Sequence, residues 1–386
     1  MTRRLRNSTL AAIVLVVLVA SLGVSAKPAH AAKGMELGLV DDPAFVSERG
    51  LKRKPALKLA DRLYTTWLRV NVPWNKVVSS PKKKKRPKHP KYDFTSYDVL
   101  FNNAAAHGIK LQLTISGFAP AWATGNDKVG CYKINVKYFN EFVRALVKHF
   151  KGNIERYSIW NEPNYVSWNG PLSQGPKRYR QMYKAGYKTI KGIDHHAKVF
   201  IGETSPYGQS GRATAPMKFM RSVLKGEHLK ADGYAHHPYD FRHAIDYRYP
   251  GKDNATIKTL KNLTRQLDKF GHSGQLTTPS GKRLDVYLTE YGYMGSGKYK
   301  VPEKKRAKYL TKAFQIALDN SRVKEMIHYL LVKPPHTGLF FDTSIVKKGG
   351  KPTKTFRAIE SWAKKQAKAK TIELPVDPKP AYQPPR

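Results

Sequence analysis

Two glutamates stand in short polar motifs, each directly after an apolar run. Glu162 lies in the motif WNEPN (160–164) and Glu290 lies in LTEYG (288–292). Two carboxyl groups that face each other can divide two tasks, because one can hold a proton as a general acid while the other acts as a nucleophile. Such chemistry requires a fold that brings both carboxyl groups to one place.

The chain around these motifs repeats one pattern: a short apolar or β-branched run, a polar loop, and a segment with apolar residues three and four apart. The eight runs that we expect to form strands are Met35–Leu39, Trp67–Val72, Ile109–Ile115, Ile154–Ile159, Val199–Gly202, Gly233–Ala235, Asp285–Leu288 and Met326–Val332. Strands that alternate with helices form a parallel sheet, and eight such units favour a closed barrel. We therefore expect an α/β fold, a (β/α)8 TIM barrel in a single domain. No glycine-rich phosphate motif follows the first strand, which counts against a dinucleotide-binding fold.

The clearest helical segment is 136–150, in which Phe139, Phe142, Leu146 and Phe150 fall on one face. Further helices are expected at about 255–270, after Pro302, and at 353–368. In a (β/α)8 barrel the catalytic side chains come from the carboxyl ends of the strands. The fourth and seventh expected strands lead into the two glutamate motifs, so both carboxyl groups should face one mouth.

Cleavage of a glycosidic bond needs this arrangement, because one carboxyl group protonates the leaving oxygen while the other attacks or stabilises the anomeric centre. If the groups lie about 5–5.5 Å apart, the second attacks directly and the anomeric configuration is retained. The motifs WNEPN and LTEYG resemble the acid/base and nucleophile motifs of the retaining glycoside hydrolases of clan A, particularly family 39 and family 5. The resemblance extends over essentially all the chain after its N-terminal segment, and it implies that Glu162 is the acid/base and Glu290 the nucleophile.

Other strand ends share this resemblance. Arg69 is similar to the second-strand arginine of the clan, which supports the nucleophile carboxylate. His237 and Tyr239 are similar to the sixth-strand His-x-Tyr, whose tyrosine donates a hydrogen bond to the nucleophile. Asn161 matches the asparagine that binds the sugar 2-hydroxyl. The resemblance thus implies a substrate-binding set beside the two glutamates, without a cofactor or a metal.

Aromatic residues that follow the expected strands are candidates for stacking on sugar rings: Trp74, Trp122, Tyr165, Trp168, Tyr291 and Tyr293. Of these, Trp122, Trp168 and Tyr291 are the predicted substrate contacts, and ordinary packing is the alternative for each. Clan members carry a tryptophan at the end of the eighth strand, as the floor of the sugar subsite. Here that end reads LVKPPH (331–336), so His336 or Phe340 is the expected floor, and Lys333 is a candidate partner for an acidic sugar.

Alternatives remain for several polar residues. Glu162 could be a helix N-terminal carboxylate and Glu290 a salt-bridge partner of Arg69. Glu203, after the fifth expected strand, is a rival site carboxylate, although such a residue more often buttresses the mouth. His236 and His237 are adjacent on a strand, so they point to opposite faces and are not expected to share a metal.

The N-terminus has the features of a secretory signal peptide: three arginines, an apolar run at 10–20 and an A-x-A site at 29–31. We expect residues 1–31 to be the signal peptide, 32–370 the catalytic domain and 371–386 a Pro-rich tail. A retained signal anchor is the alternative. The predicted protein is therefore secreted or associated with the cell wall, with no membrane segment after cleavage, and is expected to be a monomer. The single cysteine, Cys131, is expected to be a buried thiol rather than a nucleophile.

The formal net charge of +42 must attract polyanions. An anionic polysaccharide or cell-wall surface is the expected partner, with adaptation of the whole surface as the alternative; specific nucleic-acid binding is not expected, because no recognition motif accompanies the charge. Residues 80–92 (SPKKKKRPKHPKY) form a basic insertion that is expected to be exposed and mobile.

These observations together predict a secreted, retaining glycoside hydrolase that acts on a β-linked poly- or oligosaccharide. A transglycosidase with the same site and a non-catalytic glycan-binding protein on the same barrel are the alternatives. The sugar, the linkage and the choice between endo and exo action do not follow from the sequence.

Overall fold

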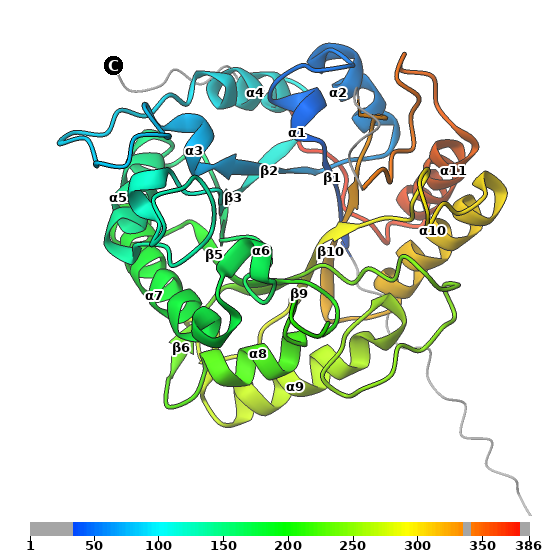
Figure 1. Cartoon of the computed structure of the whole chain (residues 1–386). Helices are drawn as coiled ribbons and strands as arrows, with labels where there is room; N and C mark the ends of the chain where they lie inside the picture. Colours follow the sequence, from blue (N-terminus) through cyan, green and yellow to red (C-terminus); the bar gives the residue numbers. More distant parts are fainter. Residues whose placement is uncertain (1–33, 335–340, 379–386) are drawn as a thin grey trace, which may run out of the picture.

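The structure is a computed structural model that describes residues 34–334 and 341–378. Eight parallel strands close into a barrel, in the order β1-β2-β3-β4-β5-β7-β9-β10 with β10 paired back to β1 (Figure 1). The barrel strands are β1 Glu36–Val40, β2 Trp67–Pro73, β3 Lys110–Ser116, β4 Arg156–Ile159, β5 Lys198–Thr204, β7 Gly233–His236, β9 Val286–Tyr291 and β10 Val323–Tyr329. The predicted (β/α)8 fold is confirmed. The predicted signal peptide, residues 1–31, lies outside the described residues.

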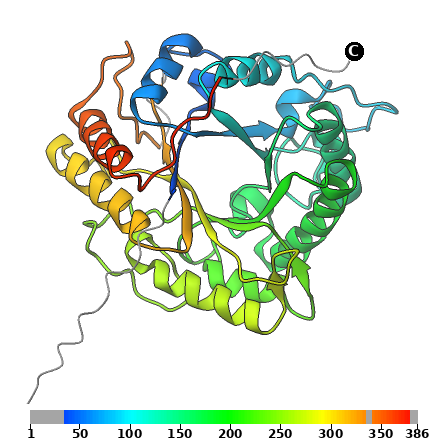
Figure 2. The ribbon, with the colours of Figure 1, turned by 180° about the vertical axis from the view of Figure 1, so that it is seen from behind.

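One long helix follows each barrel strand, and together these helices form a ring around the barrel that Figures 1 and 2 show from its two ends. The helices are α2 Arg53–Arg62, α4 Thr95–Ala105, α5 Val136–His149, α7 Gly175–Ile193, α8 Pro216–Val223, α9 Leu260–His272, α10 Glu303–Leu318 and α11 Lys354–Lys368. Three short helices, α1 Asp42–Phe45, α3 Trp74–Val77 and α6 Val166–Asn169, lie in the loops after β1, β2 and β4. The short strands β6 Leu229–Lys230 and β8 Leu276–Thr277 pair with each other outside the barrel. No helix in the described ranges is long and apolar enough to cross a membrane.

Strand alternation decides which side chains point into the barrel. In β2, residues 67, 69 and 71 share one face because side chains alternate along a strand, and Arg69 on this face is fully buried. Nearer the amino ends, Arg156 donates to Glu36 at 2.6 Å and to Glu325 at 3.1 Å. The barrel interior therefore contains buried ion pairs at two levels, and the level at the carboxyl ends is the one that carries the predicted site.

The eighth strand departs from the expected boundaries. It runs from Val323 to Tyr329, three residues before the predicted span at each end. The prediction included Leu331 and Val332 because they are apolar. In the structure they lie beyond the barrel, where their backbone pairs with the loop segment around Val346. At the other end, the polar residue Glu325 interrupts the apolar pattern although it is buried against Arg156, so the sequence did not indicate the start of the strand.

The basic insertion is anchored rather than free. Lysines 82–85 are exposed as expected, but Arg86 forms an ion pair with Glu141 of α5 and lies 4.7 Å over the ring of Tyr138. The insertion is thus exposed at its lysines and packed at Arg86, because a planar guanidinium can stack on an aromatic ring while it pairs with a carboxylate.

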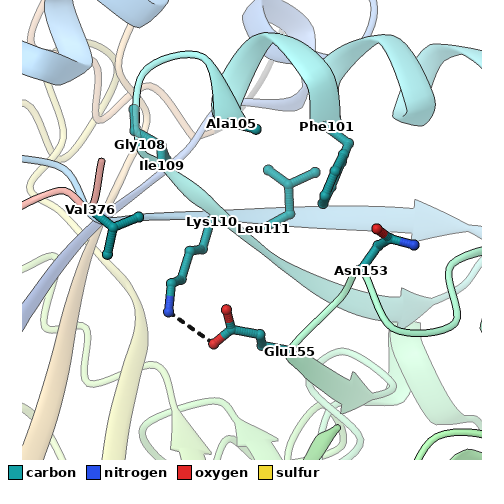
Figure 3. A pocket seen from close by; sticks show the side chains of 9 residues that line it. All are labelled: Phe101, Ala105, Gly108, Ile109, Lys110, Leu111, Asn153, Glu155 and Val376. Atoms are coloured by element: carbon teal, nitrogen blue, oxygen red, sulfur yellow. Dashed lines mark hydrogen bonds and ion pairs between the residues drawn. The ribbon is translucent and has the colours of Figure 1, made fainter. Parts of the chain in front are cut away.

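The first residues of the predicted tail lie across the amino end of the barrel. Met35 donates its backbone N–H to Thr371, and Val376 donates to Gly108 at 3.2 Å. Figure 3 shows Val376 beside a small hollow between β3 and β4, whose rim carries the Lys110–Glu155 ion pair of 3.0 Å. This hollow lies at the end of the barrel opposite to the two predicted catalytic glutamates.

Candidate active site

Both predicted catalytic glutamates lie at the carboxyl ends of strands. Glu290 is the fifth residue of β9, and Glu162 follows β4 by three residues. The turn after β4 is unusual, since Trp160 has φ 69° and Glu162 has φ 39°. Non-glycine residues in this region cost about 1–3 kcal/mol each and recur at functional sites. The backbone N–H of Glu162 donates to the carbonyl of Glu203 at 2.9 Å, which holds the turn in place.

His237 lies between the two carboxylates. Its Nδ1 is 3.2 Å from Glu162 Oε1 and 3.7 Å from Glu290 Oε2. Those two oxygens therefore lie no more than about 7 Å apart. Inverting glycosidases have carboxyl groups about 6.5–9.5 Å apart, and most of that range is excluded here. The arrangement is compatible with direct attack by one carboxylate.

Arg69 connects the nucleophile position to its surroundings. Its Nη1 donates to Glu290 Oε1 at 2.6 Å, and its Nη2 donates to Asn161 Oδ1 and Glu203 Oε2, each at 3.0 Å. The rigid fork of the guanidinium fixes all three acceptors relative to one another. Tyr239 completes the set, because its hydroxyl donates to Glu290 Oε2 at 3.1 Å. Each oxygen of Glu290 thus has its own donor, so the carboxylate is held in one orientation.

Glu203 is a buried supporting anion. Its side chain is fully buried, and its Oε2 accepts from Arg69, from His237 Nε2 at 2.7 Å and from Thr289 at 2.8 Å. Burial opposes the charge, but Arg69 and His237 outweigh burial and hold the pKa of Glu203 at about 2. These contacts support Arg69 and His237 from behind, in agreement with the supporting role that is more common for such a residue.

His237 carries the opposite shift. Burial disfavours its protonated form, but the charge of Glu290 and the hydrogen bonds to Glu162 and Glu203 outweigh burial and raise the pKa of His237 to about 9. At neutral pH the ring is therefore a cation, and both ring nitrogens donate. Its charge compensates the carboxylates of Glu203 and Glu290, which permits these groups to share one small volume.

The two glutamates face a common cavity of about 400 Å³, which also has Asn161 and Trp168 on its wall. Their side chains are 20% exposed for Glu162 and 12% exposed for Glu290, so a ligand in this cavity can reach both. Asn161, Trp168 and the two glutamates thus lie where the sequence predicted, on the wall of one cavity. Arg69, His237 and Tyr239 lie directly behind them.

Two of the predicted substrate contacts do not reach this cavity. Trp122 is 6% exposed and packs edge-on against the buried Trp74 at 5.4 Å. Tyr291 is fully buried and stacks on Tyr239 at 5.9 Å. Both predictions are corrected, because these rings belong to the packing around the site, as do those of Trp74 and Tyr293. The nearness of an aromatic residue to a strand end does not fix the face to which its ring points.

Tyr329 and Asp42 are among the wall residues that the sequence analysis missed. Tyr329, the last residue of β10, lines the cavity. The counterpart of the clan tryptophan was expected further along the chain, at 331–336. The misplaced strand end hid Tyr329; the proposed alternatives His336 and Phe340 lie outside the described residues. Asp42, directly after β1, also lines the cavity and accepts from the backbone and side chain of Asn71. Burial raises the pKa of Asp42 to about 6 against the effect of these hydrogen bonds. The position of Asp42 after the first expected strand was the available signal.

No group of three or more histidine, cysteine, aspartate or glutamate side chains in residues 34–334 and 341–378 is arranged to hold a metal ion. His236 is directed away from His237, with Nδ1 bonded to Thr204 and Nε2 to the carbonyl of Ala255. Cys131 is buried, and burial raises the pKa of its thiol to about 12, so it is a packed thiol.

Comparison with solved structures identifies the architecture. A family 39 glycoside hydrolase from the gut symbiont Bacteroides cellulosilyticus WH2 superposes with a TM-score of 0.64 over 86% of this chain, at 19% identity. A monomeric beta-xylosidase from Caulobacter crescentus CB15 superposes with a TM-score of 0.60 over 86% of this chain, at 17% identity. The chain has the fold of the family 39 glycoside hydrolases.

Xylanase 10B of Thermotoga petrophila RKU-1, solved with xylobiose, has a related barrel, with a TM-score of 0.55, 18% identity and coverage of 86% of this chain and 95% of its own. The chain spans 64% of the length of the Bacteroides family 39 structure and 69% of the Caulobacter xylosidase. No family model and no curated protein matches the sequence. The comparison thus fixes the fold, and activity has to be argued from the site.

Proposed function

We propose that the protein is a retaining glycoside hydrolase that cleaves a β-linked poly- or oligosaccharide. The observation that carries this proposal is the placement of Glu162 and Glu290 on one cavity, both within 3.7 Å of the same His237 nitrogen. Structural neighbours that share the barrel are glycoside hydrolases, which supports the same reaction class. A carbohydrate is therefore the proposed substrate.

The mechanism is a double displacement. Glu290, held by Arg69 and Tyr239, attacks the anomeric carbon while Glu162 donates its proton to the departing oxygen. The bond to the leaving group breaks and a glycosyl ester forms on Glu290. Glu162, now a carboxylate, takes a proton from water, the water oxygen attacks the anomeric carbon, and Glu290 is released.

The ester is the species to detect. The mature protein would be incubated with 2-fluoro activated β-glycosides of the gluco, xylo, manno and galacto series, followed by intact mass and peptide mapping. We expect one sugar to add to Glu290, because the fluorine slows both formation and breakdown of the ester, whereas the reactive leaving group speeds its formation alone, so that the ester accumulates. The adduct also identifies the sugar that occupies the cavity.

Two variants sharpen this experiment. Glu290→Gln should abolish labelling, whereas Glu227→Gln, at a half-buried carboxylate outside the cavity that pairs with Lys184, should label at the wild-type rate. Labelling elsewhere on the protein, or of Glu290→Gln, would refute the assignment. No adduct with any glycoside, together with intact polysaccharide binding by Glu290→Gln, would favour a non-catalytic glycan-binding protein.

The fate of the ester separates hydrolysis from transfer. The substrate would be an activated glycoside of the sugar that forms the adduct, without the fluorine and with an isotopic label. In the presence of a tenfold excess of unlabelled acceptor sugar, a hydrolase should release mainly the free labelled sugar. Predominant transfer to the acceptor would make the protein a transglycosidase.

We also propose that the protein is secreted, on the basis of the N-terminal sequence. Expression of the full chain in a bacterial host should yield mature protein outside the cytoplasm that begins after residue 31, and N-terminal sequencing would test this. Retention of the whole chain in the membrane fraction would point to a signal anchor.

A further inference from the structure

A second lobe adjoins the catalytic cavity. It has a volume of about 230 Å³ and shares Glu162 and Phe341 with the catalytic cavity, whereas Glu290 lines the catalytic cavity alone. A general acid must lie beside the bond that breaks, between the sugar that is attacked and the group that leaves. Since the attacked sugar lies over Glu290, the lobe beyond Glu162 is the place of the leaving group.

The two lobes differ in charge. The carboxyl groups of Asp42, Glu162 and Glu290 line the catalytic cavity, and no lysine or arginine of the described residues lines it. An anionic sugar would be repelled there. The second lobe has instead an exposed arginine, Arg242, on its wall.

The guanidinium of Arg242 is stacked on a ring but is not paired with a carboxylate of the described residues. Its guanidinium lies 4.9 Å over the ring of Tyr299, and Lys298 Nζ lies 5.9 Å from the same ring. Within residues 34–334 and 341–378, neither cation has a carboxylate ion-pair partner. Asp240 is close in sequence, but its Oδ1 accepts from the ring of His243 at 2.7 Å and from the backbone of Arg242, not from the guanidinium.

A buried polar atom points to a ligand in the same lobe. Ser205 is 5% exposed and lines the lobe, and its hydroxyl oxygen has no hydrogen-bond partner among the described residues. A buried hydroxyl without a partner costs free energy that a ligand can recover. Tyr165, half-buried on the same wall, offers its ring to a sugar, whereas the ring of Tyr207 is stacked on Tyr249.

We propose that this lobe is a leaving-group subsite for an acidic sugar, whose carboxylate or sulfate is bound by Arg242. The inference rests on the proposed hydrolase function for the identity of the lobe, and it predicts a neutral sugar over Glu290 followed by an acidic one. Such a substrate is a mixed, anionic polysaccharide.

The first test measures binding and needs no turnover. Glu290→Gln would be titrated by calorimetry, at 150 mM salt, with disaccharides in which a neutral sugar is β-linked to glucuronic or galacturonic acid, with disaccharides in which a neutral sugar is β-linked to a sulfated one, and with fully neutral counterparts. Tighter binding of either acidic set than of the neutral set is expected. The comparison of the uronic and sulfated sets shows which anion the subsite takes.

Arg242→Gln in the same background should weaken acidic binding by about tenfold or more, the usual loss of a charge-assisted hydrogen bond, and leave neutral binding unchanged. Arg248→Gln is the matched control, because it removes the same charge from the same loop at an exposed residue that does not line the lobe. Equal losses in the two variants, or equal affinity of acidic and neutral sugars, would overturn the proposal.

The second test uses the trapped ester on the wild-type protein. Methyl glycosides of uronic acids should restore activity faster than neutral methyl glycosides do, because an acceptor in this lobe attacks the ester. This preference should be lost in Arg242→Gln. If no ester forms and Glu290→Gln still binds polysaccharide, the hydrolase proposal fails while the binding test still decides the acidic subsite. If the ester forms but reactivates equally with both kinds of acceptor, the acidic subsite fails alone.

Discussion

At the scale of single residues, the site is a set of charges that stabilise one another. Arg69 and His237 stand among Glu162, Glu203 and Glu290, and none of these side chains is free to turn away because each is bonded to a neighbour. Removal of one member leaves another buried and uncompensated. The site should therefore be sensitive in stability as well as in activity.

Arg69→Met should destabilise the protein by about 3–5 kcal/mol, because Glu203 then loses its strongest partner in a fully buried position. Urea unfolding followed by fluorescence would measure the change. Arg62→Met is the control: Arg62 also makes a two-pronged pair, with Glu360, but at the surface, and should cost less than about 1 kcal/mol. Similar losses for both variants would contradict the interaction network.

The pH dependence of stability should report His237. Its folded pKa of about 9 lies above its unfolded value of about 6.5, so its stabilising effect is complete below about pH 6.5 and is lost as the pH rises toward 9. The free energy of unfolding should fall across this window. His237→Gln should be less stable at pH 6 and should show a flatter profile between pH 6.5 and 9. An unchanged slope in the variant would show that another group titrates there.

At the scale of the elements, the strand ends decide which residues take part. β4 delivers Glu162 through a turn with two left-handed residues, β9 delivers Glu290 within the strand, and β7 delivers His237 one residue past its end. Below them the barrel interior is filled by packed rings, with Phe200 and Tyr287 stacked 4.1 Å apart. This layer leaves no space for an added side chain.

Gly233→Ala tests that layer. A Cβ at this position in β7 would lie 2.4 Å from the ring of Tyr287 and 2.9 Å from the ring of Phe200. We expect a loss of about 1–3 kcal/mol in the free energy of unfolding, as for other overpacked cores. Gly192→Ala, in the last turn of α7 with no neighbour within 4 Å of a new Cβ, should be neutral or stabilising by up to about 1 kcal/mol. Denaturant melts of both would check this, and a neutral Gly233→Ala would show that the rings can move apart.

At the scale of the whole molecule, charge is the dominant feature. The net charge of +42 is spread along the chain, and the exposed run of lysines 82–85 adds a local concentration on the insertion after β2. Such charge draws anionic polymers to the protein over a distance set by the ionic strength. It acts before the polymer enters the cavity and is distinct from recognition by one arginine.

Binding of polygalacturonate to the protein should therefore weaken steeply between 50 and 200 mM salt, as for other polyanions. Replacement of lysines 82–85 by glutamine should reduce that salt dependence, whereas hydrolysis of a small neutral aryl glycoside should be insensitive to both salt and the substitutions. Calorimetric or anisotropy titrations and initial rates would provide the two measurements. Salt dependence of the small-substrate rate would place the charge effect inside the active site.

The sequence by itself determined the barrel and its two glutamates, because the alternation of apolar strands and amphipathic helices is a local pattern and WNEPN and LTEYG lie at strand ends. It also identified Arg69, Asn161, His237 and Tyr239 through their motifs. Their presence around one cavity agrees with the prediction, although their roles in catalysis stay predictions.

Only the tertiary structure decided which neighbours of those motifs face the cavity. Trp122 and Tyr291 follow strands just as Trp168 does, but their rings pack inward, while Tyr329 and Asp42 reach the wall. The leaving-group lobe likewise depends on residues from separate loops, such as Ser205 and Arg242, that no single motif connects. The physical reason is that the direction of a side chain depends on turn conformation and on packing between distant segments, and neither leaves a local pattern in the sequence.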